Sequence, residues 1–440
     1  MRLAVRTFNI PMRIFLLTLI LVSVGLVTVY SSSASYAGLK HRNALAKTAG
    51  GTEALAGEHT YHMPYYFERQ CFWAILGFAG MLFLYRRDYR NLKDKGMLLL
   101  ILSVVLLGLV FVPPIGKMIN GHRRWIGLLG ITFQPSELAK LALVAYMARM
   151  LTDHHDRMSS FKRGVLPALG VTLLVVSLVI FEPDIGAAFV TMSIIFLMWY
   201  IGGMRIRHLA LLVTVTVPPF ILALARHPEK MKRVIAFFLI LIGKGDSSTE
   251  VASGKGFQLL QSLIAVGSGG IHGLGLGNSM QKYFVTEQFS DFIFAIICEE
   301  LGLVGGALII LCFFLLIWEG WRIALRAPDF YGVLLASGIT LMLTISVLLN
   351  VMVVTGMAPT KGLALPLVSY GGSSMLVTLA SLGVLMNIGR YVELQGQAAR
   401  RSRRAKPSEG VAAVRRRGEK PRRGWFRRRP IWSAAVGSRS

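Results

Sequence analysis

Ten long apolar segments recur along the 440-residue chain, and they constrain its fold more than any other feature. Several approach or exceed the ~18–20 residues that cross the hydrocarbon core of a bilayer. Charged residues make up only 16% of the chain, against about 25% in a soluble domain. The sequence therefore predicts an all-α, polytopic integral membrane protein with about ten transmembrane helices. The apolar segments are 14–30, 71–85, 97–112, 137–151, 165–181, 185–203, 208–225, 292–318, 332–354 and 374–389.

Basic residues predict the orientation of the chain. The segment 390–440 holds 16 Lys and Arg residues against 3 Asp and Glu residues, and the short loop 86–95 is also basic. Because Lys and Arg favour the cytoplasmic side, both termini are predicted to be cytoplasmic. The first segment follows Arg2, Arg6 and Arg13 as a signal peptide would, but its length favours a retained span.

The chain divides by composition into a membrane domain, 1–390, and a basic tail, 391–440, which we expect to be disordered. A polybasic segment beside a membrane favours binding to anionic lipid headgroups, with docking of a partner protein as the second interpretation. No nucleic acid is expected as a ligand. The three cysteines all lie in apolar segments, which is typical of small buried hydrophobic residues rather than of disulfides or a metal site.

The loops expected on the outer side carry the unusual residues. In the long loop 227–290, Lys230, Lys232 and Arg233 precede an apolar run that is too short to span comfortably, and this pattern predicts an interfacial helix. The following GSGGIHGLGLGNS stretch suits a re-entrant turn and contact with a ligand about equally well. Any chemistry is therefore expected on the outer face.

Two further polar groups have competing interpretations. In NGHRRWIGL, Arg123, Arg124 and Trp125 suit the headgroup region of a membrane, while the paired guanidinium groups also suit a pyrophosphate ligand. Glu137 and Lys140 lie three residues apart on one predicted helix face, so mutual neutralisation is favoured over two separate catalytic roles.

Acidic residues stand out in TEQFSDFIFAIICEELG, residues 286–302. Ser290 could cap the helix, with Asp291 in its first turn beside the positive end of the helix dipole. However, Glu299 and Glu300 lie further along the same apolar segment, where charges are costly unless they are paired or face a wet cavity. This pattern predicts a helix that faces the bundle interior, with Asp291 at the outer rim of a polar cavity, where it can accept a proton.

Together, the motifs resemble those of the SEDS family (shape, elongation, division, sporulation), whose members polymerise bacterial peptidoglycan. The resemblance covers about residues 10–390 and is closest to the division-type members. Where those members read close to YLPEAHTD, this chain reads YFVTEQFSD, which places Phe289 where a histidine is usual. The motifs are NGHRRWIGL, FQPSELAK, EPDIG, GFQLLQSLIAVGSGG, SDFIFAIICEELGLVGG and LPLVSYGGSS.

The resemblance implies a glycosyltransferase that takes lipid II, a disaccharide-pentapeptide on undecaprenyl pyrophosphate, as its substrate. It implies that Asp291 is the catalytic base and that Glu299 and Glu300 are structural or cavity-lining. Glu182 and Asp184 are expected to cap the helix that follows them. No cofactor is firmly implied; a divalent cation such as Mg²⁺ could assist the leaving group. The substrate-binding candidates are Arg123, Arg124, Trp125, Glu137, Lys140, Gln258, Ser262, Lys282, Glu287, Lys361, Ser369, Gly371 and Gly372.

The resemblance also implies a partner and a place in the cell. A class B penicillin-binding protein is expected to crosslink the product, together with other division proteins, at the septum of the bacterial inner membrane. Three alternatives remain from the sequence: an elongation- or sporulation-type polymerase, a transporter that carries lipid II across the bilayer, and a scaffold without catalytic activity. The crowding of motifs on one face favours the polymerase over the transporter.

Overall fold

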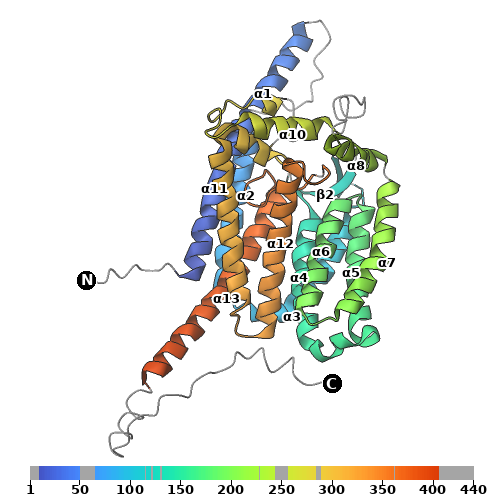
Figure 1. Cartoon of the computed structure of the whole chain (residues 1–440), viewed down its shortest axis with the longest axis vertical. Helices are drawn as coiled ribbons and strands as arrows, with labels where there is room; N and C mark the ends of the chain where they lie inside the picture. Colours follow the sequence, from blue (N-terminus) through green and yellow to red (C-terminus); the bar gives the residue numbers. More distant parts are fainter. Residues whose placement is uncertain are drawn as a thin grey trace, which may run out of the picture. The chain divides into compact units, whose positions relative to one another are not determined.

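The computed structural model describes residues 9–49, 65–113, 115–119, 122–128, 131–226, 228–242, 256–283, 289–360 and 362–405. The described part is predominantly helical, as predicted, and a helix occupies each of the ten apolar segments. These helices are α1 (Ile10–Ala49), α2 (Tyr65–Arg86), α3 (Arg90–Leu109), α4 (Pro135–Asp153), α5 (Leu166–Phe181), α6 (Ile185–Ile201), α7 (Ile206–Ala225), α11 (Ile293–Ala324), α12 (Phe330–Val354) and α13 (Gly372–Ala405) (Figure 1).

Six helical segments in the described part of the chain are long and apolar enough to cross a membrane. Helices α6 and α7 contain shorter apolar stretches, Ile185–Ile201 and Ile206–Leu222. Helix α13 continues to Ala405, so the beginning of the tail is helical where disorder was expected from residue 391. The chain divides into two compact units, Met1–Val392 and Glu393–Ser440. The six segments are Ile10–Ser32, Tyr65–Arg86, Phe161–Phe181, Ile293–Ala324, Phe330–Val354 and Gly372–Ala398.

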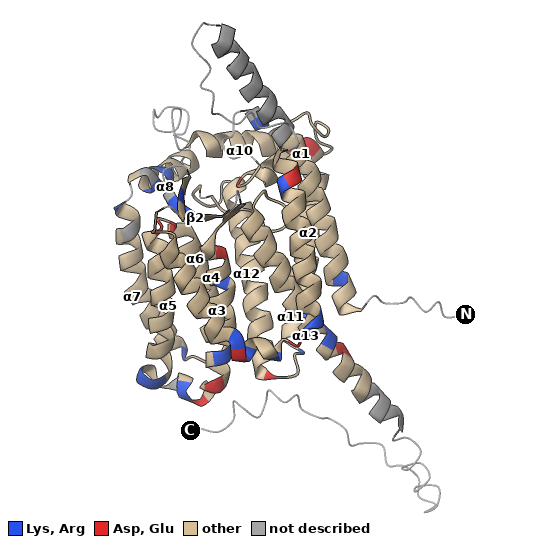
Figure 2. Ribbon diagram, turned by 180° about the vertical axis from the view of Figure 1, so that it is seen from behind, with Lys and Arg blue, Asp and Glu red and all other residues tan. Residues whose placement is uncertain are grey.

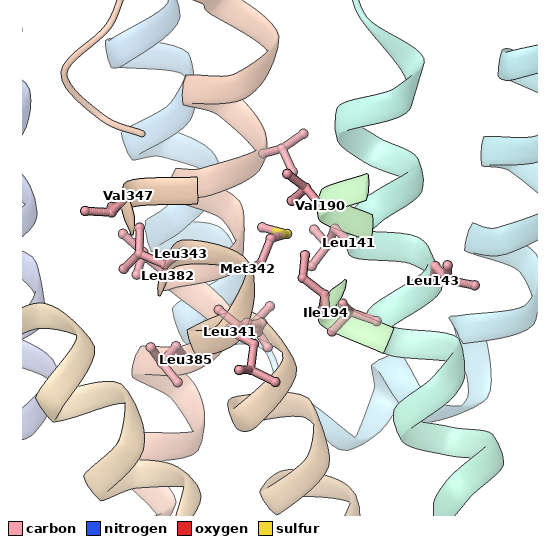
Figure 3. Packing of buried hydrophobic residues seen from close by; sticks show 14 of the residues in the cluster. Leu141, Leu143, Val190, Ile194, Leu341, Met342, Leu343, Val347, Leu382 and Leu385 are labelled. Carbon is pink, nitrogen blue, oxygen red and sulfur yellow. The ribbon is translucent and has the colours of Figure 1, made fainter. Parts of the chain in front are cut away.

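Helix α12 lies at the centre of the first unit, where it packs against α4, α6 and α11. The close approach depends on Gly338, because a Cβ there would lie 2.5 Å from a methyl group of Val144 and 2.8 Å from the sulfur of Met198. Small residues at helix contacts let backbones approach in this way inside a membrane. Leucine, isoleucine, valine and methionine side chains from α4, α6, α12 and α13 fill the remaining space (Figure 3).

Charged residues gather toward the two ends of the bundle, and its middle is almost free of them (Figure 2). One end carries α8 (Pro228–Leu241), α10 (Phe257–Ser268) and a small sheet, and we call it the loop end. Helix α8 covers Lys230, Lys232 and Arg233 and the apolar run after them, so a helix is present where an interfacial one was predicted, and it packs against α7. The other end, which carries the connections α2–α3 and α11–α12, is called the opposite end.

A three-stranded antiparallel sheet occupies much of the predicted loop 113–136, and no sequence pattern predicted it. Its order is β1 (Gly116–Ile119), β2 (His122–Leu128) and β3 (Ile131–Phe133). In the register, Lys117 lies opposite Trp125, and Ile126 lies opposite Phe133. The guanidinium group of Arg69 on α2 donates to the hydroxyl of Thr132 at 3.0 Å and so ties the sheet to the bundle.

Helix α11 is broken at Gly302, whose backbone adopts φ 67° and ψ −168°. The amides of Leu303 and Val304 therefore donate to the carbonyls of Gly270 and Ile271, at 2.9 and 3.3 Å. In return, the amides of Leu274 and Gly275 donate to the carbonyls of Glu299 and Glu300, each at 3.0 Å. The glycine-rich stretch thus exchanges backbone hydrogen bonds with α11 on both sides of the break, and we call this arrangement the splice. It satisfies backbone N–H and C=O groups that would otherwise be unpaired inside a membrane.

Candidate active site at the loop end

Asp291 lies just before α11 at the loop end, and its side chain is half-buried. The helix begins at Ile293, its N-cap residue is Phe292, and no side chain caps it. Asp291 is therefore not in the first turn of the helix, and Ser290 is not the N-cap residue, so the purely structural interpretation of these two residues was wrong. The first turn of α11 has no acidic residue.

The backbone around Asp291 is held by two neighbouring elements. The side-chain amide of Asn350 on α12 donates to the carbonyl oxygen of Asp291 at 2.9 Å. The amide of Tyr370 donates to the carbonyl oxygen of Phe289, also at 2.9 Å. Phe289 is buried, and its ring packs against Tyr66 and Tyr370, with centroid distances of 4.8 and 5.6 Å.

The carboxylate of Asp291 lies over Gly362, in the segment that joins α12 to α13. A Cβ at Gly362 would lie 2.5 Å from Oδ2 of Asp291. The rest of the segment is held by side chains from other elements: Gln70 on α2 donates to the carbonyl of Ser369 at 3.0 Å and accepts from the amide of Gly371 at 3.3 Å. The hydroxyl of Ser369 accepts from the amide of Leu365 at 2.7 Å. We call this α12–α13 segment the floor of the site: Gly362 lies against the Asp291 carboxylate, and Ser369 and Gly371 take part in the bonds that hold the segment.

A cavity adjoins this floor between α4, α12 and α13, and the segment that carries Leu363, Ala364 and Pro366 forms one of its walls. Its polar lining is Glu137, Lys140, Ser346, Ser374, Thr378 and Ser381. The ammonium group of Lys140 lies 2.9 Å from Oε1 of Glu137, and Lys140 is only 7% exposed. The pairing expected from their spacing is present, and the pair faces the cavity.

A second polar cluster joins the sheet to the turn between α5 and α6. Arg124 donates to the carbonyls of Glu182 at 3.1 Å and Pro183 at 2.6 Å, and it lies 3.8 Å from the carboxylate of Asp184. Lys230 on α8 donates to the same Pro183 carbonyl at 2.6 Å. Arg123 and Trp125 lie on the same strand and are half-buried.

The two carboxylates of this cluster differ in their contacts. Asp184 is the N-cap residue of α6 and accepts from the amide of Ala187 at 3.0 Å, as expected. Glu182 does not cap that helix, because it ends α5 instead; its side chain is fully buried and accepts no hydrogen bond from the described residues. Burial, reinforced by Asp184, raises the pKa of Glu182 to about 8, and Arg124 opposes the rise. Burial, with Arg124 nearby, lowers the pKa of Lys230 to about 8.

Glu299 and Glu300 are structural, as expected. The carboxylate of Glu299 accepts from the hydroxyl of Ser279 and from the amides of Met280 and Gln281, the Met280 amide at 2.9 Å. Glu300 accepts from the hydroxyl of Ser31 on α1 at 2.7 Å. Both therefore fasten neighbouring segments to the break in α11. They do not line the cavity described above.

The other predicted residues are dispersed over the loop end. The hydroxyl of Ser262 on α10 donates to the carbonyl of Val354 at 2.9 Å, which fastens α10 to the end of α12. Lys282 is buried and donates to the carbonyl of Gly277. Gln258 is half-buried on α10. Gly372 begins α13, where a Cβ would collide with the indole of Trp73. Glu287 and Lys361 lie outside the described residues.

The described residues offer no group of three or more His, Cys, Asp or Glu side chains that could hold a metal ion. The side chains described around Asp291 therefore do not form a ligand set for the divalent cation that the sequence left open.

Sequence reasoning missed Asn350 and Gln70, two of the described side chains that hold backbone at the site. A signal for Asn350 was present: it is the single asparagine within the long apolar helix FYGVLLASGITLMLTISVLLNVMVV. A polar amide in such a helix needs a partner, so its presence points to a specific contact at that depth. Gln70 precedes an apolar segment and carried no comparable signal.

Comparison with known proteins places the fold and the site in context. The model of the family described as "Cell cycle protein", which covers FtsW, RodA and SpoVE, matches residues 12–394. Stage V sporulation protein E of Bacillus subtilis (strain 168) is 38% identical over 377 residues, which cover 86% of this chain and 96% of the relative. A relative in Geobacter metallireducens named "Probable peptidoglycan glycosyltransferase FtsW" is 37% identical over 377 residues, which cover 85% of this chain and 93% of the relative.

Solved structures with the same fold agree with these relatives. One, described as "Structural coordination of polymerization and crosslinking by a peptidoglycan synthase complex", matches with a TM-score of 0.65 and 30% identity, over 86% of this chain and 97% of the other. The rod shape determining protein RodA of Thermus thermophilus matches with a TM-score of 0.56 and 28% identity, over 86% of this chain and 95% of the other.

Proposed function

Because the chain belongs to the cell cycle protein family of FtsW, RodA and SpoVE, we propose that Asp291 is the general base of its glycosyl transfer reaction. The protein is a multi-pass membrane enzyme, a peptidoglycan glycosyltransferase that joins lipid II units into glycan strands.

In the proposed reaction, Asp291 accepts the proton from the 4-hydroxyl group of the acceptor's GlcNAc. The freed oxygen attacks the anomeric carbon of the donor's MurNAc and inverts it, and the bond to undecaprenyl pyrophosphate breaks. The pyrophosphate leaves with the electron pair and needs no proton, so a second carboxylic acid is not required. This agrees with the structural roles of Glu299 and Glu300, which are both engaged elsewhere.

The observation that carries the proposal is the placement of Asp291. Its half-buried carboxylate lies before the helix, in a turn held by α12 and by the α12–α13 segment. The floor of that turn continues into the wall of the cavity that holds the Glu137–Lys140 pair. The carboxylate therefore lies on a built surface beside a polar cavity, and the cap position of α11 belongs to Phe292.

A cationic side chain at the same end is proposed to support departure of the pyrophosphate. Arg123 lies half-buried on β2 and is the described guanidinium group that we assign to the leaving group. Arg124 donates to the carbonyls of Glu182 and Pro183, so we assign it to holding the sheet against the α5–α6 turn. Lys361 stays a candidate by its place in the sequence.

The loop end is proposed to face the outside of the inner membrane, with both termini in the cytoplasm and the enzyme acting at the division septum. A class B penicillin-binding protein is the proposed crosslinking partner, in line with the related synthase complex, which coordinates polymerization and crosslinking. A sporulation-type role is the alternative, because the Bacillus subtilis relative carries that name.

Purified protein with its class B partner and labelled lipid II in detergent tests the proposal, because no leaflet crossing is needed there. Native protein is expected to make long glycan strands. General-base catalysis contributes about 100- to 10,000-fold, so Asp291→Asn is expected to lower the rate by that factor at an unchanged melting temperature.

Other results would contradict the proposal. Glycan strands made at the native rate by Asp291→Asn would remove this residue from the chemistry. Absence of strands from native protein, together with lipid II movement across vesicle membranes that survives Asp291→Asn, would favour a transporter instead.

A further inference from the structure

We propose that Asn350 is a positioning residue for Asp291, and that Gly362 leaves the space in which the Asp291 carboxylate lies. Asn350 touches no reacting atom in this scheme; it acts through the backbone that carries the base. The inference rests on the proposed function, in which Asp291 takes the proton of the acceptor hydroxyl.

Asn350 joins the two irregular segments that meet at the site. Its Nδ2 group donates to the carbonyl of Asp291 at 2.9 Å and to the carbonyl of Leu363 at 2.6 Å. The first of these segments precedes α11, and the second follows α12. The side chain is 1% exposed, so water does not compete for these bonds. One rigid helix thereby fixes the base and its floor relative to each other.

The chemistry of the contact selects asparagine. Both partners are carbonyl oxygens, which only accept hydrogen bonds, so the NH₂ group must face them. The reversed amide would set Oδ1 against two carbonyl oxygens. An aliphatic residue offers no donor, and an ionised aspartate offers only acceptors. The Oδ1 atom accepts no hydrogen bond from the described residues, so packing alone does not explain a polar side chain here.

A second hydrogen bond fixes the position of the turn that carries Asp291. The amide of Tyr370 holds the carbonyl of Phe289, two residues before Asp291. The ring of Phe289 is enclosed by Tyr66 and Tyr370, whose own centroids are 5.4 Å apart. With one end of the turn fixed there, the Asn350 bond at the other end holds the Asp291 backbone from which the carboxylate projects.

Gly362 leaves room for the Asp291 carboxylate because it has no side chain. A Cβ at this position would lie 2.5 Å from Oδ2 and 3.3 Å from Cγ of Asp291, so it would displace the carboxylate. Gly362 is exposed, and its φ lies outside the left-handed region that penalises other residues. An alanine there therefore moves the carboxylate with little effect on the fold.

The principal test compares Asn350→Leu with Asn387→Leu. Asn387 on α13 is a matched control: it is also 1% exposed and bridges backbone groups, donating to the Tyr85 carbonyl at 2.7 Å and accepting from the Tyr89 amide at 3.0 Å. However, it does so at the opposite end. Both variants lose buried hydrogen bonds, so both are expected to lower the melting temperature of the detergent-purified protein.

Only Asn350→Leu is expected to change catalysis. A base displaced by roughly 1 Å costs up to about 100-fold, so kcat for lipid II polymerisation is expected to fall about 10- to 100-fold, with KM nearly unchanged. Asn387→Leu is expected to keep the native kcat. Equal kcat values in the two variants would overturn the inference.

Gly362→Ala provides a test that does not depend on the stability of Asn350→Leu. It is compared with Gly267→Ala on α10, which is also exposed and whose Cβ would meet no atom within 4 Å. Gly362→Ala is expected to lower kcat about 10-fold or more at an unchanged melting temperature. Native kcat in Gly362→Ala would show that the carboxylate does not need this space.

Asn350→Asp adds a pH readout that a merely structural role would not give. Ionised aspartate repels the two carbonyls, while its protonated form can donate one hydrogen bond. The kcat of this variant is therefore expected to rise, relative to native protein, as the pH falls. A constant ratio across the pH range would contradict positioning by hydrogen bonding.

The outcomes for Asp291 and Asn350 separate the two proposals. Full activity in Asp291→Asn would refute the general-base function, whatever Asn350 does. An inactive Asp291→Asn together with a fully active Asn350→Leu would leave the function intact and refute the positioning role alone.

Discussion

The loop end and the opposite end of the bundle use the same polar residue types for different purposes. At the opposite end, charged side chains mostly pair with other side chains: Asp329 accepts from the hydroxyl of Tyr89 at 2.5 Å and from Arg90 at 3.1 Å. Glu319 lies 2.9 Å from Arg13 and 2.8 Å from Arg322. These contacts join α1, α3, α11 and α12 at places where regular helices end.

At the loop end, polar side chains mostly hold irregular backbone. Asn350, Gln70, Arg124 and Glu299 all bond to main-chain groups. The backbone there leaves its helices in several places, most clearly at Gly302. Side chains that pair with each other hold the ends of regular helices together, whereas side chains bonded to irregular backbone fix a shape that regular helices cannot provide. This difference supports the proposal that the reaction takes place at the loop end.

The largest expected difference between the ends is that between Asp291 and Asp329. Asp291→Asn is expected to lower polymerisation about 100- to 10,000-fold. Asp329→Asn keeps an oxygen that can accept from the Gly332 amide, now at 2.7 Å, and loses the ion pair with Arg90. It is expected to cost about 1 kcal/mol of stability or less and to leave the rate unchanged.

Rate measurements on lipid II and thermal unfolding of both variants check this contrast. If Asp329→Asn lost activity to the same degree as Asp291→Asn at an unchanged melting temperature, catalysis could not be assigned to the loop end alone.

The next largest effect is expected from substituting Gly302, at the break in α11, and it is an effect on stability. Gly302 has φ 67°, and a Cβ there would collide with the backbone at Gly273 and Ile271. Gly302→Ala is expected to lower the free energy of unfolding by roughly 2–6 kcal/mol, from backbone strain and overpacking together. Gly80→Ala on α2 is the control, because its Cβ would meet no atom within 4 Å.

Unfolding in detergent and the yield of folded protein measure this effect. A Gly302→Ala variant as stable as Gly80→Ala would show that α11 can run straight through the site and that the splice is dispensable.

The helices could be predicted from the sequence because each apolar segment carries its own signal. The chemistry of Glu299 and Glu300 was also predictable, since carboxylates in an apolar segment demand partners. Their actual partners were not, because the splice brings amides from residues 274–281 to α11. The sheet was missed for a similar reason: short strands in a polar loop are fixed by their contacts with the bundle, such as that of Arg69 with Thr132.

The site itself was only half predictable. Asp291 was singled out from its place near the start of an apolar helix that carries acidic residues, but the sequence did not reveal that the helix begins only at Ile293 or that Asn350 and Tyr370 hold the turn before it. The substitution at Phe289 looked like the loss of a polar group. In the structure, it is an aromatic anchor between Tyr66 and Tyr370. Such roles depend on residues that are distant in sequence, which local patterns do not reveal.

The smallest expected effect is on the pH dependence of stability, to which Glu182 and Lys230 at the loop end contribute. Burial raises the pKa of Glu182 from an ordinary 4.5 to about 8. Between these values the folded protein binds more protons than the unfolded chain, so this residue makes stability fall as the pH rises from about 4.5 to 8. The lowered pKa of Lys230, about 8 against 10.5, makes stability rise between those two values.

Glu182→Gln is therefore expected to remove the fall in stability between about pH 4.5 and pH 8 and to raise the melting temperature by a few degrees at pH 8. The rise in stability between about pH 8 and pH 10.5, which comes from Lys230, is expected to stay unchanged.

At the opposite end, burial disfavours the charge of Asp153, but Lys93 and Arg149 outweigh it and hold the pKa of that carboxyl below its ordinary value. Asp153→Asn is therefore expected to lower stability at neutral pH. If melting curves showed the same slope with and without Glu182, its buried carboxyl would be held by partners that keep it ionised, and the contrast between the two ends would lose its electrostatic part.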